Sequence, residues 1–263
     1  MSAIVIIPAR FASTRFPGKP LALLKGLPVI QHVYKNAMNS SLADDVLVAT
    51  DNEIIFETVL SFGGKAVMTS AGHLSGTDRI AEVSSTLSHD IIVNVQGDEP
   101  LIRPDMIDTA ISVLDDPYAS IGTLAVRIMN LQDIFDPNIV KVVFNAAGFA
   151  FYFSRAPIPY HRDEWKDMDQ PVRQFRSRVA GDSKLPPPFS CFKHIGIYSY
   201  RRDVLMKLAG TPPSRLELIE KLEQLRAMEN GFRIKIGETL HETLGVDTPE
   251  DLERIEKCLN LSL

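Results

Sequence analysis

The chain has 263 residues, of which 45% are hydrophobic, and its formal net charge at pH 7 is −5. This length is enough for one α/β domain, or a domain with a subdomain, that buries a sizeable core without disulfide or metal support. The acidic balance argues against a general nucleic-acid-binding protein, and no apolar run approaches the ~20 residues of a membrane span.

Short apolar runs alternate with amphipathic patterns through the first half of the chain. Strands are expected at residues 3–9, 44–50, 65–69 and 90–95, and helices at 28–38, 52–62, 75–87 and 103–114. In the first of these helices, Val29, Ile30 and Val33 share one face. The alternation is typical of βαβ units, which build a mostly parallel sheet with helices on both faces.

The pattern changes in the second half of the chain. Two β-rich runs flank an Ala-Ala-Gly turn within 140–155 and predict a hairpin, and residues 161–190 form a long polar connection with several prolines. A strand at 193–200, one long helix at 214–231, a strand at 232–237 and a helix at 247–259 are expected after it. We therefore predict a doubly wound α/β fold, a single domain over 1–263 with an inserted β-rich subdomain at about 138–200.

The loop after the first strand carries three cations on an acidic background. In the segment IPARFASTRFPGKPL they are Arg10, Arg15 and Lys19. Ligands of open parallel sheets bind at the carboxyl ends of the strands, and converging cations without carboxylate partners favour a polyanion there. The alternative is a solvated surface. The loop is not a Walker A motif, because Pro20 stands where a magnesium-binding Ser or Thr is needed, and it lacks the glycines of a dinucleotide fingerprint.

Two aspartates are candidates for a metal site. Asp98 follows the buried strand at 90–95, so it is expected at the same edge of the sheet as the cationic loop. A carboxylate is repelled by a nearby polyphosphate unless a divalent cation lies between them, and oxygen ligands suit magnesium; the alternative is a turn residue. For Asp247 the spacing alone favours a structural role, because Asp247 or Thr248 could cap the following helix and Asp251 could complete a capping box.

Seven motifs, in order between Ile4 and about Ile255, resemble those of the 3-deoxy-manno-octulosonate (Kdo) cytidylyltransferases, the CMP-Kdo synthetases of lipopolysaccharide assembly. They are IIPARFASTRFPGKPL, VATDN, HLSGTDRIAE, VNVQGDEPLI, YFSRAPIP, HIGIYSY and GVDTPEDLERI. The resemblance implies a nucleotidyltransferase fold of the nucleotide-diphospho-sugar transferase type and a homodimer. It also implies a reaction in which CTP and Kdo give CMP-Kdo and pyrophosphate with Mg²⁺.

The resemblance further implies roles for individual residues, in three groups. The nucleotide would be bound by Arg10, Arg15, Lys19, Ser75, Gly76 and Arg79. The catalytic centre would contain Lys19, Gln96, Asp98 and Asp247, with Asp98 and Asp247 sharing Mg²⁺. The sugar would be held by Arg155, His194, Tyr198, Glu223 and Gln224. Without the resemblance, His194 is more typical of a packed core histidine, and Arg155 of a surface residue at the edge of the hairpin.

Other functions stay open at the level of the sequence. A cytidylyltransferase for sialate, or for an amino-sugar analogue of Kdo, would need much the same nucleotide site. A glycosyltransferase would need an Asp-x-Asp metal motif after a strand, whereas the matching string here, Asp167–Asp169, lies in the polar connection. A nucleotide-binding regulator without catalysis would have no need of both candidate metal carboxylates.

The expected location is the cytoplasm. The N-terminus has no basic region and no cleavage site of small residues, so we expect no secretory signal. Cys191 and Cys258 lack metal-ligand spacing and fit a reducing compartment. The expected partners are CTP and Kdo as substrates and a second copy of the chain, with no nucleic acid and no membrane insertion.

Overall fold

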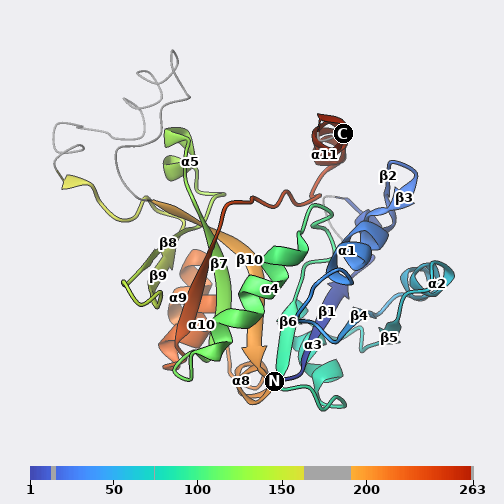
Figure 1. Ribbon diagram of the computed structural model, residues 1–263, viewed down its shortest axis with the longest axis horizontal. Helices are drawn as coiled ribbons and strands as arrows, with labels where there is room; N and C mark the ends of the chain where they lie inside the picture. The colour runs from blue at the N-terminus through green and yellow to red at the C-terminus, as the bar shows by residue number, and fades with distance from the viewer. Residues whose placement is uncertain (13–15, 74, 163–190, 262–263) are drawn as a thin grey trace.

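The computed structural model describes residues 1–12, 16–73, 75–162 and 191–261 (Figure 1). Arg15, the Asp167–Asp169 string and nearly all of the 161–190 connection lie outside the described residues. The expectations attached to them therefore stay predictions.

The described strands form one large mixed sheet at the centre of the molecule (Figure 1). Nine of the described strands join it, in the order β11-β7-β10-β6-β1-β4-β5, with β8 pairing to β10 and β9 to β8. Their bounds are β1 (Ala3–Ala9), β4 (Asp45–Thr50), β5 (Ala66–Met68), β6 (Ile91–Asn94), β7 (Ile121–Arg127), β8 (Lys141–Phe144), β9 (Ala150–Ser154), β10 (Phe192–Arg201) and β11 (Ile234–Thr239). β2 (Leu23–Leu24) and β3 (Leu27–Pro28) form a separate short ladder.

Most of the central pairings are parallel, as predicted. β1 pairs in parallel with β4 and β6, β4 with β5, and β11 with β7. β10 runs antiparallel to β6 and β7 and joins the two parallel parts of the sheet. The carboxyl ends of β1 and β6 consequently lie side by side, and the loops that follow them meet at one edge.

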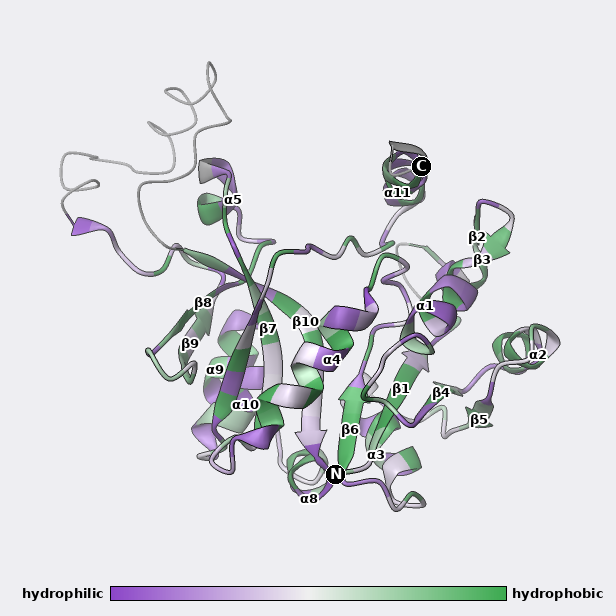
Figure 2. Ribbon diagram, in the orientation of Figure 1, coloured by the Kyte–Doolittle hydropathy of each residue, from purple (hydrophilic) through white to green (hydrophobic). Residues whose placement is uncertain are grey.

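Helices cover both faces of the sheet. They are α1 (Val29–Ala37), α2 (Glu53–Ser61), α3 (Gly76–Ser84), α4 (Pro104–Ser112), α5 (Leu131–Phe135), α8 (Arg202–Ala209), α9 (Arg215–Glu220), α10 (Gln224–Glu229) and α11 (Pro249–Leu261). Val5 and Ile7 of β1 pack in one core with α1, α2 and α4, whereas Ile4 and Ile6 pack in a second core with α3, α8 and α10. Because both faces are covered, β1 and β6 are mainly apolar (mostly green in Figure 2), which confirms the doubly wound fold.

Several elements differ from the prediction. The sequence patterns miss β2, β3, β7, α5 and α8, and the single long helix expected at 214–231 is wrong, since α9 and α10 occupy this range. Lys221 adopts a φ of 55° and ends α9. The apolar spacing continues across the break with no glycine or proline, so periodicity gives no sign of it. The break leaves Glu223 immediately before α10, which starts at Gln224.

The predicted hairpin is confirmed as β8 and β9, with Lys141 opposite Ser154. β8 also pairs with β10, where Val142 lies opposite Phe192, so the hairpin extends the main sheet. The 138–200 subdomain stays a prediction, because much of it lies outside the described residues. Within the described ranges, no helix is both long and apolar enough to cross a membrane.

Candidate active site

A cavity of about 430 Å³ opens at the carboxyl ends of β1 and β6, where this fold class binds ligands. Its described lining residues are Pro8, Ala9, Arg10, Ala12, Lys19, Pro20, Gly76, Gln96, Gly97, Asp98 and Asp247. Arg10, Lys19, Gly76, Gln96, Asp98 and Asp247 were all predicted from the sequence, and the fold brings them together. We call this space the large cavity.

Lys19 lies between the two candidate metal carboxylates. Its Nζ donates to Asp98 Oδ2 and, at 3.2 Å, to Asp247 Oδ1. Burial lowers the pKa of Lys19, but the Asp98 and Asp247 carboxylates outweigh it and hold the pKa above its ordinary value. The expectation that the cations of this loop lack acidic partners is therefore wrong for Lys19. The chain supplies those partners from far along the sequence, which spacing within the loop could not show.

The loop that carries Lys19 turns at Gly18. Gly18 has a φ of 72°, and a Cβ there would lie 3.3 Å from the ring of Phe11. A short 3-10 turn, Lys19–Leu21, follows it, and Pro20 is buried in this turn. The Lys19 ammonium group is consequently presented by a turn that backbone hydrogen bonds close, from the Gly18 N–H to the Phe11 oxygen (2.9 Å) and from the Leu21 N–H to the Gly18 oxygen (2.8 Å).

Asp247 reaches the cavity at the start of α11. The Asp251 carboxylate accepts hydrogen bonds from the backbone N–H groups of Asp247 (3.1 Å) and Thr248 (3.0 Å), and the Asp251 N–H donates to Thr248 Oγ1 (3.3 Å). Thr248 is therefore the capping side chain, and the Asp247 carboxylate is directed to Lys19. The Val246 N–H donates to the Asp98 backbone oxygen at 2.8 Å, which joins the two aspartate segments. The capping role that spacing offered to Asp247 thus belongs to Thr248, and Asp247 lines the large cavity; its part in a metal site stays a prediction.

Arg10 lines the large cavity and also orders its far wall. Its Nη2 donates to the backbone oxygens of His73 (2.6 Å) and Ser75 (3.0 Å). Ser75 caps α3, because its hydroxyl accepts from the Asp78 N–H while the Asp78 carboxylate accepts from the Ser75 N–H. These bonds fix the first turn of α3, and with it Gly76, at the cavity.

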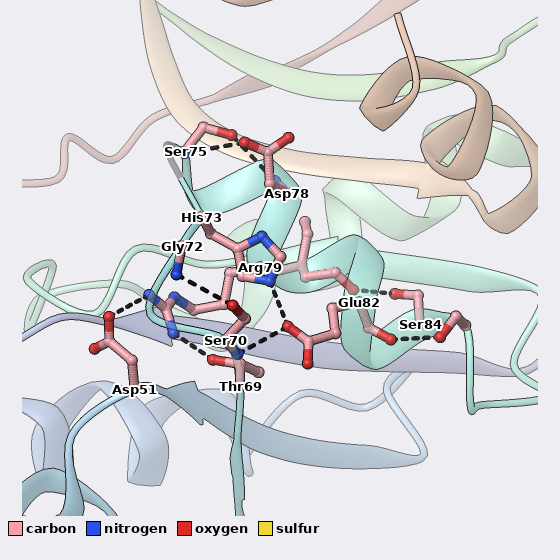
Figure 3. Close-up of polar contacts among 12 residues, drawn as sticks. Asp51, Thr69, Ser70, Gly72, His73, Ser75, Asp78, Arg79, Glu82 and Ser84 are labelled. Carbon is pink, nitrogen blue, oxygen red and sulfur yellow. Dashed lines mark hydrogen bonds and ion pairs between the residues drawn. The ribbon is translucent and has the colours of Figure 1, made fainter.

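Arg79 does not have the predicted place beside the nucleotide. Its side chain is completely buried, it is not among the described residues that line the cavity, and Figure 3 shows its guanidinium between Asp51 and Thr69. Nη2 lies 2.7 Å from Asp51 Oδ2, and Nη1 donates to Thr69 Oγ1. The guanidinium is directed to the loops after β4 and β5 because a buried cation needs an ion-pair partner, which Asp51 supplies. We therefore correct the role of Arg79 from contact with the nucleotide to support of these loops.

A second, smaller cavity of about 170 Å³ adjoins the first. It is lined, in the described part of the chain, by Gly76, Thr77, Asn94, Gln96, Ile121, Tyr198, Tyr200, Leu208, Glu223, Gln224 and Ala227. Three of the predicted sugar-binding residues, Tyr198, Glu223 and Gln224, are among them. Gly76 and Gln96 line both cavities, so two ligands would meet at these residues. We call this space the small cavity.

The sequence analysis missed several residues of the small cavity. Asn94 accepts a hydrogen bond from Gln96 Nε2 at 3.4 Å, and Thr77 follows directly after Gly76. Both stand inside quoted motifs, VNVQGDEPLI and HLSGTDRIAE, but they are buried neutral residues. A search for charged groups could not single them out. Tyr200 could have been found from the strand pattern, since it stands two residues after Tyr198 and so lies on the same face of the strand.

Arg155 and His194 are not among the described residues that line the two cavities. Arg155 donates to the backbone oxygens of Glu220 from Nε (2.7 Å) and of Pro137 from Nη1 (2.9 Å). Its predicted direct contact with the sugar is therefore corrected, because backbone carbonyls already occupy the guanidinium. His194 Nε2 lies 2.9 Å from Thr123 Oγ1, and its ring packs edge-on against Phe153, so it is the packed core histidine that its position alone suggested.

We predict that His194 stays neutral throughout the working pH range. Burial lowers its pKa to about 3, whereas a histidine in the unfolded chain titrates near 6.5. Its contribution to stability is complete above about pH 6.5 and is lost as the pH falls toward 3, because only the unfolded chain then takes up the proton. The ring resonances of His194 in an NMR titration should not move between pH 5 and 8. A midpoint near 6.5 would contradict the burial described here.

The charged side chains of the large cavity are suited to bind a divalent cation together with a polyanion. Asp98 and Asp247 present hard oxygen donors suited to a divalent cation, and Arg10 and Lys19 present positive charge to the same space. Among the described residues, no cluster of three or more His, Cys, Asp or Glu side chains could hold a metal alone. A cation bound here would therefore need oxygen ligands from a substrate or from water.

Comparisons with known proteins agree with this arrangement. A sequence model of the cytidylyltransferase family matches residues 4–236. The 3-deoxy-manno-octulosonate cytidylyltransferase of Geobacter sulfurreducens is 52% identical over 256 residues, covering 97% of this chain and 98% of the relative. The corresponding protein of Thermodesulfovibrio yellowstonii is 52% identical over 268 residues, covering 99% of each chain.

Solved structures give the same result. A CMP:2-keto-3-deoxy-manno-octonic acid synthetase complexed with CTP is 41% identical, with a TM-score of 0.88 over 100% of both chains. A cytidylyltransferase from Leptospira borgpetersenii, 20% identical with a TM-score of 0.60 over 100% of this chain and 88% of its own, shares the fold. The resemblance drawn from the motifs is confirmed, and the chain belongs to the 3-deoxy-manno-octulosonate cytidylyltransferase family.

Proposed function

We propose that this chain transfers CMP from CTP to the anomeric hydroxyl of Kdo, releasing pyrophosphate and supplying CMP-Kdo for lipopolysaccharide assembly. The observation that carries the proposal is the pair of cavities that meet at Gly76 and Gln96. The large cavity presents the charges that a triphosphate and a cation require, and the small one presents polar groups on a partly apolar floor. A nucleotide and a sugar acid can therefore react at the shared boundary.

In this mechanism the protein binds and orients the two substrates. The sugar hydroxyl attacks the α-phosphorus in line and loses its proton to solvent, while the bond between the α-phosphorus and the oxygen of the departing pyrophosphate breaks. No covalent bond to the protein is required. Lys19 and Arg10 stabilise negative charge on the phosphates. Gln96, between the two cavities, orients the reacting groups, and its amide is held by Asn94.

Asp98 and Asp247 fit a magnesium ion. Mg²⁺ commonly takes one or two protein carboxylates and completes its shell with substrate phosphates and water, which is the donor set present here. When bound, Mg²⁺ would offset charge on the phosphates and lower the pKa of a coordinated hydroxyl. Lys19 shares both carboxylates, so its ammonium group keeps them close together before any cation binds.

The test is pyrophosphate release from CTP and Mg²⁺ with Kdo, with sialate, with an amino-sugar analogue of Kdo, and without acceptor. Release with Kdo alone is the expected result, and excess chelator should abolish it until Mg²⁺ is restored. Release with sialate or the analogue would assign a different sugar acid to the small cavity. Measurable CTP binding without release in any mixture would favour a regulatory protein instead.

Arg155 gives a further prediction for the sugar side. Its guanidinium holds the backbone at Glu220, close before Glu223, and Glu220 Oε2 accepts from the Arg155 N–H at 3.0 Å. Arg155→Lys keeps the positive charge but loses the planar guanidinium that donates to two backbone oxygens. We therefore expect the KM for Kdo to rise roughly 3- to 10-fold, which is the effect of losing one or two hydrogen bonds. The KM for CTP should change less than about 2-fold in the same steady-state assay. Equal rises in the KM values for Kdo and CTP would show that Arg155 supports the fold in general rather than the sugar site.

We also propose a homodimer in the cytoplasm. Phe151 of β9 is 65% exposed, and Leu218 and Ile219 of α9 are 54% and 65% exposed. β9 and α9 are joined where Ser154 Oγ donates to Glu220 Oε1 at 2.6 Å, so these apolar side chains belong to neighbouring elements. A monomer in light scattering at micromolar concentration would overturn the dimer. The buried thiol of Cys191 agrees with a reducing compartment.

A further inference from the structure

The small cavity contains a buried acceptor that has no donor. Glu223 Oε1 is shielded from solvent and, within the described part of the chain, has no hydrogen-bond partner. The same carboxylate lines the small cavity. A buried carboxylate oxygen without a partner is costly, so this atom favours a ligand that brings a hydroxyl or amine donor.

Thr77 lies beside this carboxylate. Thr77 is 4% exposed and lines the small cavity together with Glu223 and Tyr200. Burial raises the pKa of both Glu223 and Tyr200, and hydrogen bonding by the Thr77 side chain opposes this by lowering it. When Glu223 is ionised, its carboxylate can only accept, so the single Thr77 hydroxyl proton is donated to it. The Tyr200 hydroxyl then donates to Thr77 Oγ1. In this state the short relay runs from Tyr200 through Thr77 to Glu223.

The backbone that carries Thr77 is fixed. Thr77 is the second residue of α3, whose start is closed by the reciprocal Ser75–Asp78 capping box. Gly76, immediately before it, lines both cavities. The Thr77 hydroxyl can thus fix the position of the Glu223 carboxylate relative to Gly76, where the two substrates would meet.

We propose that Thr77 is a positioning residue that aims the Glu223 carboxylate into the small cavity, where its second oxygen accepts a hydrogen bond from a hydroxyl group of the sugar acid. The inference rests on the proposed function. It assigns a task to a neutral residue that acts through Glu223 rather than by binding CTP.

The groups around Glu223 set its pKa, so the effect of the Thr77 hydroxyl on this pKa can be measured. Burial raises the pKa of Glu223, and the Thr77 hydrogen bond lowers it. The other groups that face it are Arg226, Glu217, Asp78, Tyr198 and Tyr200. Arg226 is engaged by Glu217 through contacts of 2.5 Å and 2.8 Å, so its charge is largely offset. Loss of the Thr77 hydroxyl should consequently raise the pKa of Glu223 further.

Thr77→Val and Thr77→Ser form a matched pair for the experiment, since the first keeps the shape and the second keeps the hydroxyl. In the full-length protein we expect Thr77→Val to raise the KM for Kdo on the order of 10- to 100-fold, the size of a lost hydrogen bond to a charged group. The KM for CTP should change less than about 2-fold. In Thr77→Val the acid limb of kcat/KM for Kdo should also move to higher pH. Thr77→Ser should restore both properties.

Other outcomes would overturn the inference. Equal rises in both KM values, an unmoved acid limb, or a Thr77→Ser variant as impaired as Thr77→Val would each assign Thr77 to packing alone. If Thr77→Val does not fold, Tyr200→Phe tests the same relay, with a rise of roughly 3-fold expected for Kdo and none for CTP; no rise would reject the relay. A wild-type protein that releases no pyrophosphate with Kdo would instead refute the proposed function.

Discussion

Asp98→Asn should lower turnover on the order of 100-fold or more while the protein stays folded. The Asp98 carboxylate contacts Lys19 at the edge of the large cavity, with Asp247 on the other side of the same ammonium group. An amide cannot supply the negative charge that holds a divalent cation beside the phosphates. Pyrophosphate release at saturating CTP and Kdo measures the loss, and Mn²⁺ binding by calorimetry should weaken in parallel.

The matched control for this prediction is Asp203→Asn. Asp203 is 67% exposed, contacts Lys207 on the surface of α8 at 3.1 Å, and is not among the described residues that line either cavity. The control should retain turnover within about 2-fold, since an exposed ion pair contributes little. Near-normal turnover in a folded Asp98→Asn protein would remove Asp98 from the mechanism. A lower melting temperature without weaker Mn²⁺ binding would assign it to stability.

Part of this site could be predicted from residues alone. Lys19 and Asp98 both follow apolar strands, and the rule that ligands bind at the carboxyl ends of parallel strands brings them to one edge. Asp247 could not be placed this way. Its segment carries a complete capping box, and the spacing does not tell which of two adjacent residues caps the helix. The resemblance to a known family supplied that choice, and the hydrogen bonds of Thr248 explain it.

Other predictions failed for reasons that only the folded chain reveals. The break at Lys221 has no glycine or proline to mark it, yet it brings Glu223 and Gln224 to the small cavity. Tertiary contacts override helix periodicity there. Arg79 was placed at the nucleotide because its motif matches, but a motif does not show whether a side chain faces the ligand or the core.

The corrected role of Arg79 predicts a large effect on stability. Asp51→Ala should lower the free energy of unfolding by about 3–5 kcal/mol, because it leaves a fully buried guanidinium without its counter-charge. Arg79 Nε already has no hydrogen-bond partner in the described part of the chain, and Nη1 is engaged by Thr69. Glu82 also interacts electrostatically with Arg79, but its carboxylate is engaged by His73, so Asp51 is the acid in direct contact with the guanidinium. Urea denaturation followed by circular dichroism measures the change.

Asp45→Ala is the control that separates burial from the ion pair itself. Asp45 Oδ2 and Lys65 Nζ are also 2.7 Å apart, as are Asp51 Oδ2 and Arg79 Nη2, but Lys65 is 62% exposed whereas Arg79 is 0% exposed. Water and salt screen the exposed pair, so Asp45→Ala should cost about 1 kcal/mol or less. Equal losses of unfolding free energy in the two variants would show that burial of Arg79 does not determine how much its ion pair with Asp51 stabilises the fold.

A folded Asp51→Ala protein should also keep its KM for CTP within about 2-fold, since Arg79 supports the loops after β4 and β5 rather than contacting the nucleotide. A large rise in that KM, with little loss of stability, would return Arg79 to the nucleotide site.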